Sequence, residues 1–155
     1  MSDLILWRHA DAETGVPDIQ RALTRKGHKQ ARRVARWLHE RLPSSALICS
    51  SPAMRAQQTA LALAQLAPRE LFTLDALAPS TRLDTALDAI RATDRTRTVV
   101  LVGHQPTLGE IVAALLGVHD GDWHLRKGAL VWLSEMESDD GSRAVLHAAI
   151  TPDLV

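Results

Sequence analysis

Six short runs rich in leucine and β-branched residues alternate with longer segments of helical period along this chain of 155 residues. The runs span residues 4–8, 46–50, 71–74, 98–103, 129–134 and 144–150. Such alternation is typical of βαβ units, in which helices cover a mostly parallel sheet. We therefore predict an α/β fold, a single-domain three-layer sandwich. The last two runs, separated by Asp139-Asp140-Gly141, predict an antiparallel hairpin at the edge of that sheet.

The segments between the runs carry helix signals. Two of them are marked by apolar residues at helical spacing: Ala31, Val34, Ala35, Leu38 and Leu42 in the first, and Leu83, Leu87 and Ile90 in a shorter one. Ser51 and Pro52 predict the N-cap and first turn of a further helix that continues to about Ala67. Pro106 predicts the start of the last helix, and Gly117 its C-cap.

Composition argues against several classes of function. Lys and Arg number 18, and Asp and Glu also number 18, so the chain lacks the broad positive field of nucleic-acid-binding proteins. No apolar stretch reaches the roughly 20 residues that cross a bilayer, and charges near the start leave no signal-peptide core. With Cys49 as the sole cysteine, we predict a cytoplasmic protein without nucleic-acid or membrane partners.

Two histidines directly follow apolar strand-like runs. His9 follows the first run and its Arg8, and His104 follows the fourth run and Gly103. Because ligands of open α/β sheets bind beyond the carboxyl ends of the strands, we expect both imidazoles to meet in one crevice. Arg8 and Arg55 add guanidiniums, and helices beginning after Ser51 and Gln105 add positive dipole ends. This combination predicts a phosphate site.

Such a site contains the parts needed to transfer a phosphoryl group. Guanidiniums and helix N-termini stabilise the charge on the phosphoryl oxygens during in-line transfer. Nearby arginines disfavour imidazolium, so His9 keeps a lone pair near neutral pH. One histidine is then expected to attack phosphorus while the other donates a hydrogen bond to a phosphate oxygen.

Four blocks of residues resemble the histidine phosphatase superfamily and, within it, the short phosphohistidine phosphatases of the SixA type. The blocks are Trp7-Arg8-His9-Ala10, Arg21-Ala22-Leu23-Thr24 with Gly27 and Gln30-Ala31, Ser50-Ser51-Pro52 with Arg55-Ala56 and Gln58-Thr59, and Val102-Gly103-His104-Gln105-Pro106. The resemblance spans nearly the whole chain. It implies a phosphoglycerate mutase-like fold and one histidine phosphatase domain over residues 1–155.

The resemblance also implies roles for individual residues. His9 would be the nucleophile that forms a phosphohistidine intermediate, while Arg8, Arg55 and His104 complete the phosphate pocket. Arg21 would be an additional substrate contact. The expected chemistry needs no cofactor and no metal.

The chain departs from the family pattern in two places. Ala10 stands where the family usually has glycine after the catalytic histidine, a substitution common among the short members. Larger relatives also carry a lobe with an acidic general acid after the third strand, and the segment 74–79 has no room for it. Asp75 and Asp11 are the candidate proton donors. Because a phosphohistidine expels an imidazole nitrogen, which needs less protonation than an alkoxide, the missing acid favours a histidine-phosphorylated protein as substrate.

Other functions fit the same residues. A small-molecule phosphomonoesterase or phosphotransferase could use the same pocket, and so could a module that binds phosphate or phosphoprotein with negligible turnover. Cys49 and Arg55 have the spacing of cysteine-dependent tyrosine phosphatases. The interval between them, however, holds a proline and no glycine, whereas a phosphate-wrapping loop needs small flexible residues. Burial in the core is the interpretation we favour for Cys49.

Two further features fall outside the predicted pocket. The first helix is basic, through Arg25, Lys26, Lys29, Arg32, Arg33 and Arg36. Such a face is usually solvated, but part of it could steer acidic protein partners or phosphate toward the pocket. The segment His119-Asp120-Gly121-Asp122-Trp123-His124 matches no standard zinc spacing, and we predict no metal there.

Overall fold

A computed structural model describes residues 2–118, 123–139 and 141–155. Its strands are β1 (Asp3–Arg8), β2 (Leu47–Ser50), β3 (Leu71–Thr73), β4 (Val99–Gly103), β5 (Leu130–Ser138) and β6 (Gly141–Ile150). Its α-helices are α1 (Arg25–His39), α2 (Met54–Ala64), α3 (Leu83–Ala92) and α4 (Thr107–Leu116). Short 3-10 helices are η1 (Asp18–Gln20), η2 (Asp75–Leu77) and η3 (Pro152–Leu154).

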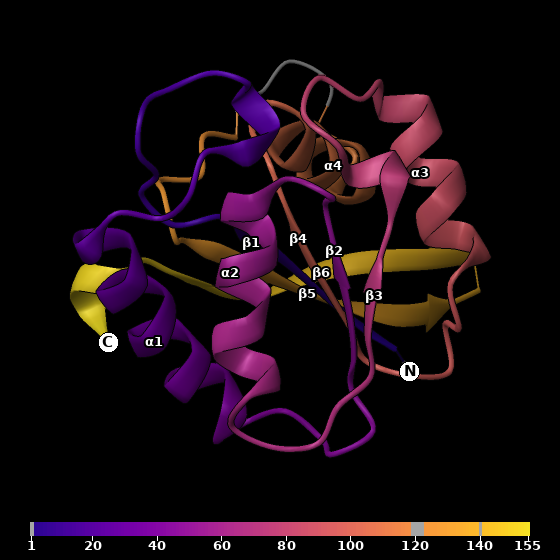
Figure 1. Ribbon diagram of the computed structural model, residues 1–155. Coiled ribbons are helices and arrows are strands. Elements are labelled where there is room, and N and C mark those ends of the chain that lie inside the picture. Colours follow the sequence, from indigo (N-terminus) through magenta and orange to yellow (C-terminus); the bar gives the residue numbers. More distant parts are fainter. Residues whose placement is uncertain (1, 119–122, 140) are drawn as a thin grey trace.

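The strands form one mixed sheet in the order β3-β2-β4-β1-β5-β6. The first four of these strands are parallel to one another. β5 then pairs antiparallel with β1, and β6 antiparallel with β5. Figure 1 shows the β5–β6 hairpin extending the sheet at one side. The predicted mostly parallel sheet with an antiparallel edge hairpin is therefore confirmed.

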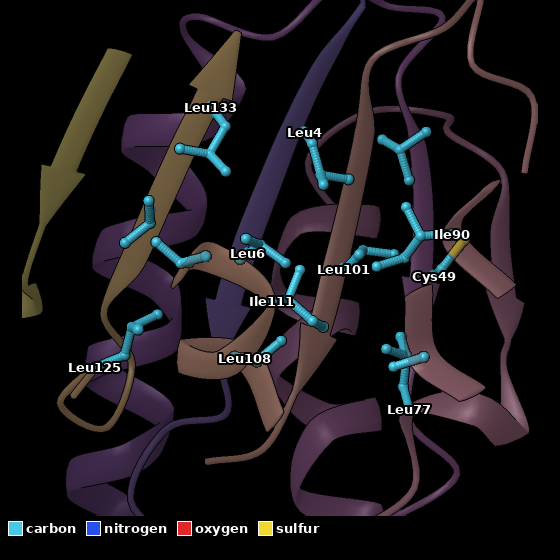
Figure 2. Close-up of a cluster of buried hydrophobic side chains, with 14 of the residues drawn as sticks. Leu4, Leu6, Cys49, Leu77, Ile90, Leu101, Leu108, Ile111, Leu125 and Leu133 are labelled. Atoms are coloured by element: carbon cyan, nitrogen blue, oxygen red, sulfur yellow. The ribbon is translucent and has the colours of Figure 1, made fainter. Parts of the chain in front are cut away.

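Successive residues of each central strand pack alternately into two apolar cores, one on each face of the sheet. On one face, Leu4 and Leu6 of β1 and Leu101 of β4 pack with Leu108 and Ile111 of α4 (Figure 2). On the opposite face the core is built from other residues of β1, α1 and α2: Ile5, Trp7, Val34, Leu38 and Leu63. Burial on both faces explains why the central strands read as continuous apolar runs. The result is three layers, with α1 and α2 on one side of the sheet and α4 on the other (Figure 1).

Several predicted helix ends agree with the structure, and those of α2 do not. Gly117 adopts φ +71° at the C-cap of α4, and Pro106 holds its N-cap position. Helix α2 begins at Met54 behind Ala53, which provides no side-chain cap, and it ends at Ala64. The prediction of a helix capped by Ser51 and continuing to Ala67 was thus wrong at both ends. Within the described ranges, no helix has the length and apolar character to cross a membrane.

Candidate active site

The two strand-end histidines meet at the carboxyl edge of the sheet. β1 and β4 are adjacent and parallel, with Arg8 opposite Gly103, and the backbone N–H of His9 donates to the carbonyl of Gly103 at 3.1 Å. The imidazole of His9 consequently lies beside that of His104, with ring centroids 5.1 Å apart. The two residues are only 7% and 5% exposed. The predicted convergence of the histidines is observed.

The ring of His9 is fixed in one orientation. Its Nδ1 lies 2.7 Å from the carbonyl oxygen of Ala10, and because a carbonyl only accepts hydrogen bonds, Nδ1 must carry the proton. Burial lowers the pKa of His9 to about 4, and the charges of Arg55 and Arg8 act in the same direction against the opposing hydrogen bond to Ala10. At neutral pH the imidazole is therefore uncharged, and its Nε2 holds a free lone pair.

His104 is held by Ser51. The Nε2 atom of His104 lies 2.7 Å from Ser51 Oγ, and that hydroxyl also accepts from the backbone N–H of Ala53 at 3.1 Å. Burial lowers the pKa of His104 to about 3, with His9 and Arg55 adding to the effect. Ser51 thus orients a neutral histidine at the start of α2, instead of capping the helix as the sequence predicted.

Arg55 brings a buried positive charge to the histidine pair. It is the second residue of α2, and it is 4% exposed. Its Nη1 donates to the carbonyl of Asp18 at 2.9 Å, and its Nη2 donates to the Asp18 carboxylate at 3.0 Å. Its Nε is buried and has no hydrogen-bond partner among the described residues. The buried N–H of Nε is thus not used by any described residue.

Arg8 directly precedes His9 and brings a second guanidinium to the site. Its Nη1 donates to the carbonyl of Leu125 at 2.8 Å, and its Nε is buried without a described partner. Its charge contributes to lowering the pKa values of both His9 and His104. The four residues predicted to form the phosphate pocket are therefore close enough to act on one another.

Comparisons with known proteins agree with this geometry. The family model of the histidine phosphatase superfamily (branch 1) matches residues 4–79. An uncharacterized protein of Picosynechococcus sp. is 34% identical over 140 residues, which cover 84% of this chain and 84% of that protein. The chain belongs to the histidine phosphatase superfamily. This membership identifies it as a phosphatase, a hydrolase of phosphorylated compounds.

Two solved structures place this histidine phosphatase within the SixA type. The SixA protein of Nakamurella multipartitia, a candidate phosphohistidine phosphatase, superposes with a TM-score of 0.83 at 26% identity, covering 97% of this chain and 96% of that one. The corresponding protein of Agrobacterium tumefaciens gives a TM-score of 0.80 at 28% identity, covering 97% of both chains. The phosphoglycerate mutase-like fold predicted from the sequence is thereby confirmed.

Asp18 is a residue of the candidate site that the sequence analysis missed. Its carboxylate accepts from Arg21 Nη1 at 2.9 Å and from Arg55 Nη2 at 3.0 Å. These two hydrogen bonds lower the pKa of Asp18 below its ordinary value. Its charge also acts on the pKa of His104, which it raises. The D-x-x-R spacing of Asp18 and Arg21 was the available signal for an ion pair, but nothing local to it points to Arg55.

Arg21 reaches the site through this same carboxylate. Besides Asp18, it contacts the carbonyl of Glu13, to which its Nε donates at 2.7 Å. Its charge adds to the lowering of the pKa of His9. The structure therefore places Arg21 at the rim of the histidine pair, next to Arg55.

The two predicted proton donors, Asp11 and Asp75, differ in their hydrogen-bond partners. Asp11 accepts from Thr24 Oγ1 at 2.7 Å and from Lys127 Nζ at 2.9 Å, and these bonds lower the pKa of its carboxyl. Asp75 begins η2, and its side chain has no described hydrogen bond or ion pair. The main influences on the pKa values of the two histidines include the carboxylate of Asp18, which raises the pKa of His104, and include neither Asp11 nor Asp75.

The backbone around His9 is tied to α1 and α2 by buried side chains. Thr59 Oγ1 accepts from the N–H of Ala10 at 3.1 Å and donates to the carbonyl of Arg55 at 2.7 Å. Gln30 Oε1 accepts from the N–H of Asp11 at 2.9 Å. A Cβ on Gly27 would lie 1.9 Å from the carbonyl oxygen of Asp11, so α1 approaches this segment as closely as a glycine permits. These residues were anchors of the family resemblance without an assigned role, and the structure gives them one in positioning.

Two other predictions concern residues away from the histidine pair. Cys49 is buried in the apolar core of Figure 2, and burial raises the pKa of its thiol to about 11, so the thiol is protonated at neutral pH. Among the described residues no group of three or more His, Cys, Asp and Glu side chains is arranged to hold a metal. Residues 119–122 of the loop considered for zinc lie outside the described residues.

Proposed function

We propose that this histidine phosphatase hydrolyses phosphohistidine on a partner protein through a covalent phosphoryl intermediate on His9. The observation that carries the choice of nucleophile is the hydrogen bond from Nδ1 of His9 to the Ala10 carbonyl. With the pKa of His9 lowered to about 4, this bond leaves an unprotonated Nε2 beside two guanidiniums.

The reaction runs in two steps. In the first, Nε2 of His9 attacks phosphorus as the bond from phosphorus to the leaving imidazole nitrogen breaks. That nitrogen takes the electron pair and a proton from water, which becomes hydroxide. In the second, another water attacks the phosphorus, the bond to Nε2 breaks, the electron pair returns to His9, and the orthophosphate leaves after giving its extra proton to the hydroxide. Arg8, Arg55 and His104 stabilise the phosphoryl oxygens in both steps, and Arg21 assists at the rim. No metal or cofactor takes part in this scheme.

The state of the nearby carboxylates supports phosphohistidine as the substrate. Asp18 and Asp11 are both held ionised by hydrogen bonds and ion pairs that lower their pKa values. An ionised carboxylate cannot protonate a departing alkoxide, and positioned proton transfer is worth about 10²–10⁴-fold in rate. An imidazole leaving group depends less on that proton, so a phosphoramidate is the better substrate for this site.

A comparison of substrates tests the choice. Initial rates are measured on a histidine-phosphorylated protein domain and on a panel of sugar and nucleoside phosphate esters, with His9→Ala as the inactive variant and His28→Ala, an exposed histidine of α1, as its matched control. We expect the phosphohistidine protein to be hydrolysed with the higher kcat/KM, and only His9→Ala to abolish it. Equal or faster turnover of an ester would make the protein a small-molecule phosphomonoesterase. Binding of phosphate without turnover of any substrate would make it a binding module.

A further inference from the structure

One cavity of the molecule is lined by Arg8, the residue that precedes His9, and not by His9 itself. Its volume is about 640 Å³, and α1, the segment after residue 123 and η3 form its walls. Six basic residues line it: Arg8, Lys26, Lys29, Arg33, Arg126 and Lys127. Asp11 and Asp153 are the carboxylates among its lining residues. In a chain whose charges balance overall, this cavity concentrates positive charge.

Much of this charge has no partner. Lys127 pairs with Asp11 at 2.9 Å, and Arg126 acts on the carboxylate of Asp153. The charge of Lys26 also acts on Asp11, but Lys26, Lys29 and Arg33 form no ion pair among the described residues. A positive field of this kind attracts anions and is not needed to hold the walls of the cavity together.

The position of the unpaired residues on α1 argues against a purely structural role. Lys26, Lys29 and Arg33 are spaced so that they follow one face of the helix. Helix α1 has no acidic residue in its first turn, where the macrodipole favours negative charge and disfavours lysine. Lys26, which lies in that first turn, therefore costs the helix some stability, and an anionic ligand that neutralises it would remove that cost.

Arg8 connects the cavity to the histidine pair. It lines the cavity, directly precedes His9 in the chain, and lowers the pKa values of His9 and His104 through its charge. An anionic group in the cavity would consequently lie next to a phosphoryl group on His9. The two could belong to one substrate.

The character of the walls decides which substrate fits. Pockets for small molecules are mostly apolar, with a few fixed polar groups. Here Lys26, Lys29, Arg33, Arg126 and Lys127 are all exposed, and their long side chains carry hydrated, movable charges. Such walls suit the carboxylates of a protein surface.

We propose that this cavity is a docking site for acidic side chains that surround the phosphohistidine on the partner protein. This inference rests on the proposed function, because it requires a protein substrate. Of the basic residues of α1, Lys26, Lys29 and Arg33 line the cavity and belong to the docking site. Arg32 and Arg36 of the same helix do not line the cavity and lie outside the docking site.

Charge reversal on two faces of α1 tests the docking site. Lys29→Glu/Arg33→Glu alters the cavity, and Arg32→Glu/Arg36→Glu makes the same change in charge, at the same spacing, elsewhere on the helix. We measure kcat/KM on a histidine-phosphorylated acidic domain and on free phosphohistidine. The ratio of kcat/KM on the acidic domain to kcat/KM on free phosphohistidine should fall by about ten- to a hundredfold in the cavity variant and by less than about twofold in the control. Rising salt should lower the wild-type ratio toward that of the cavity variant.

Equal losses in both double variants, or an unchanged ratio in the cavity variant, would overturn the docking site. A separate measurement keeps this outcome distinct from failure of the proposed function. Titration calorimetry with a short polyglutamate peptide should show binding to wild type and to the control variant, and loss of binding in the cavity variant, whether or not phosphohistidine is hydrolysed. If wild type binds the peptide but hydrolyses only esters, the proposed function fails while the acid-binding cavity stands. If wild type does not bind the peptide, the docking site is wrong.

Discussion

The Nη2 atom of Arg55 lies 3.0 Å from a carboxylate oxygen of Asp18, so an acidic side chain of the protein itself holds a guanidinium expected to bind the phosphoryl group. Asp18 contacts Arg21 through its other carboxylate oxygen. Because both arginines bind a carboxylate, the site is already shaped for an anion, and a phosphoryl group that uses Nη2 of Arg55 must share it with Asp18 or displace Asp18.

Asp18→Asn should tighten the binding of orthophosphate. The amide removes a negative charge from beside Arg55 and leaves the shape of the side chain unchanged. The side chain of Asp18 is more than half exposed, so its ion pair with Arg55 is screened by solvent and contributes little. We therefore expect the inhibition constant of orthophosphate to fall by only about two- to fivefold. Competitive inhibition by orthophosphate measures it, with Asp84→Asn on exposed α3 as the control. A higher inhibition constant in Asp18→Asn would show instead that Asp18 is needed to position Arg55.

Thr59→Val should destabilise the segment that carries His9. Thr59 is fully buried, and its hydroxyl accepts from Ala10 N–H while donating to the Arg55 carbonyl. Valine keeps the shape but leaves a buried N–H without a partner, which costs about 1–3 kcal/mol. Urea denaturation should show this loss, and Thr59→Ser, which retains the hydroxyl, should recover part of it. A valine variant as stable as wild type would contradict the assigned role of the hydroxyl.

Hydrolysis should persist well below neutral pH. The pKa of His9 is lowered to about 4, so its Nε2 stays unprotonated and nucleophilic until the pH falls toward that value. The acid limb of kcat/KM should therefore lie near pH 4, far from the ordinary histidine value of 6.5. Circular dichroism at each pH separates loss of activity from unfolding. An acid limb centred near 6.5 would show that His9 is not the buried neutral nucleophile.

The same histidines link folding stability to pH. Both His9 and His104 have pKa values far below 6.5 in the folded chain, so the unfolded chain binds more protons whenever the pH is below 6.5. The free energy of unfolding should then be highest above pH 6.5 and fall as the pH drops toward 4. Urea titrations at several pH values measure the slope, and His9→Asn should flatten it. A free energy of unfolding that increases as the pH is lowered from 6.5 to 5 would contradict the burial of His9 and His104 as neutral side chains.

Cys49→Ala should leave phosphatase activity largely intact. The thiol is buried, and burial raises its pKa to about 11, so it supplies no thiolate at neutral pH. We also expect native wild type to resist alkylation by iodoacetamide, while unfolded protein reacts. Loss of hydrolysis in a folded Cys49→Ala variant would restore the cysteine mechanism.

The sheet and the histidine pair were predictable because they rest on local patterns. Continuous apolar runs mark strands buried on both faces, as in β1 and β4, and parallel neighbours place their carboxyl ends at the same edge. His9 and His104 each directly follow such a run. Their meeting therefore follows from strand periodicity and one topological rule.

The missed features depend on contacts between distant residues. Asp18 reaches Arg55 across 37 positions in the chain, and it begins the short 3-10 helix η1, which no strand or helix pattern in the sequence marks. The carboxylate of Asp11 accepts from Thr24 and Lys127, which lie 13 and 116 positions away in the chain, so no local pattern marks this pairing either. Ser51, the predicted cap of α2, accepts from the N–H of Ala53 and also contacts Nε2 of His104, and the helix begins only at Met54. Contacts of this kind join residues far apart in the chain, so no local pattern marks them.

The most direct test of the account is to trap the phosphoenzyme. Wild type and His9→Ala are mixed with a histidine-phosphorylated protein, quenched with alkali within the first turnover, digested and analysed by mass spectrometry. We predict one added phosphoryl group, stable in alkali and labile in acid, on the peptide that contains His9 of wild type, and none in His9→Ala. A phosphoryl group on any other residue, or steady hydrolysis by His9→Ala, would contradict the assignment of His9 as nucleophile.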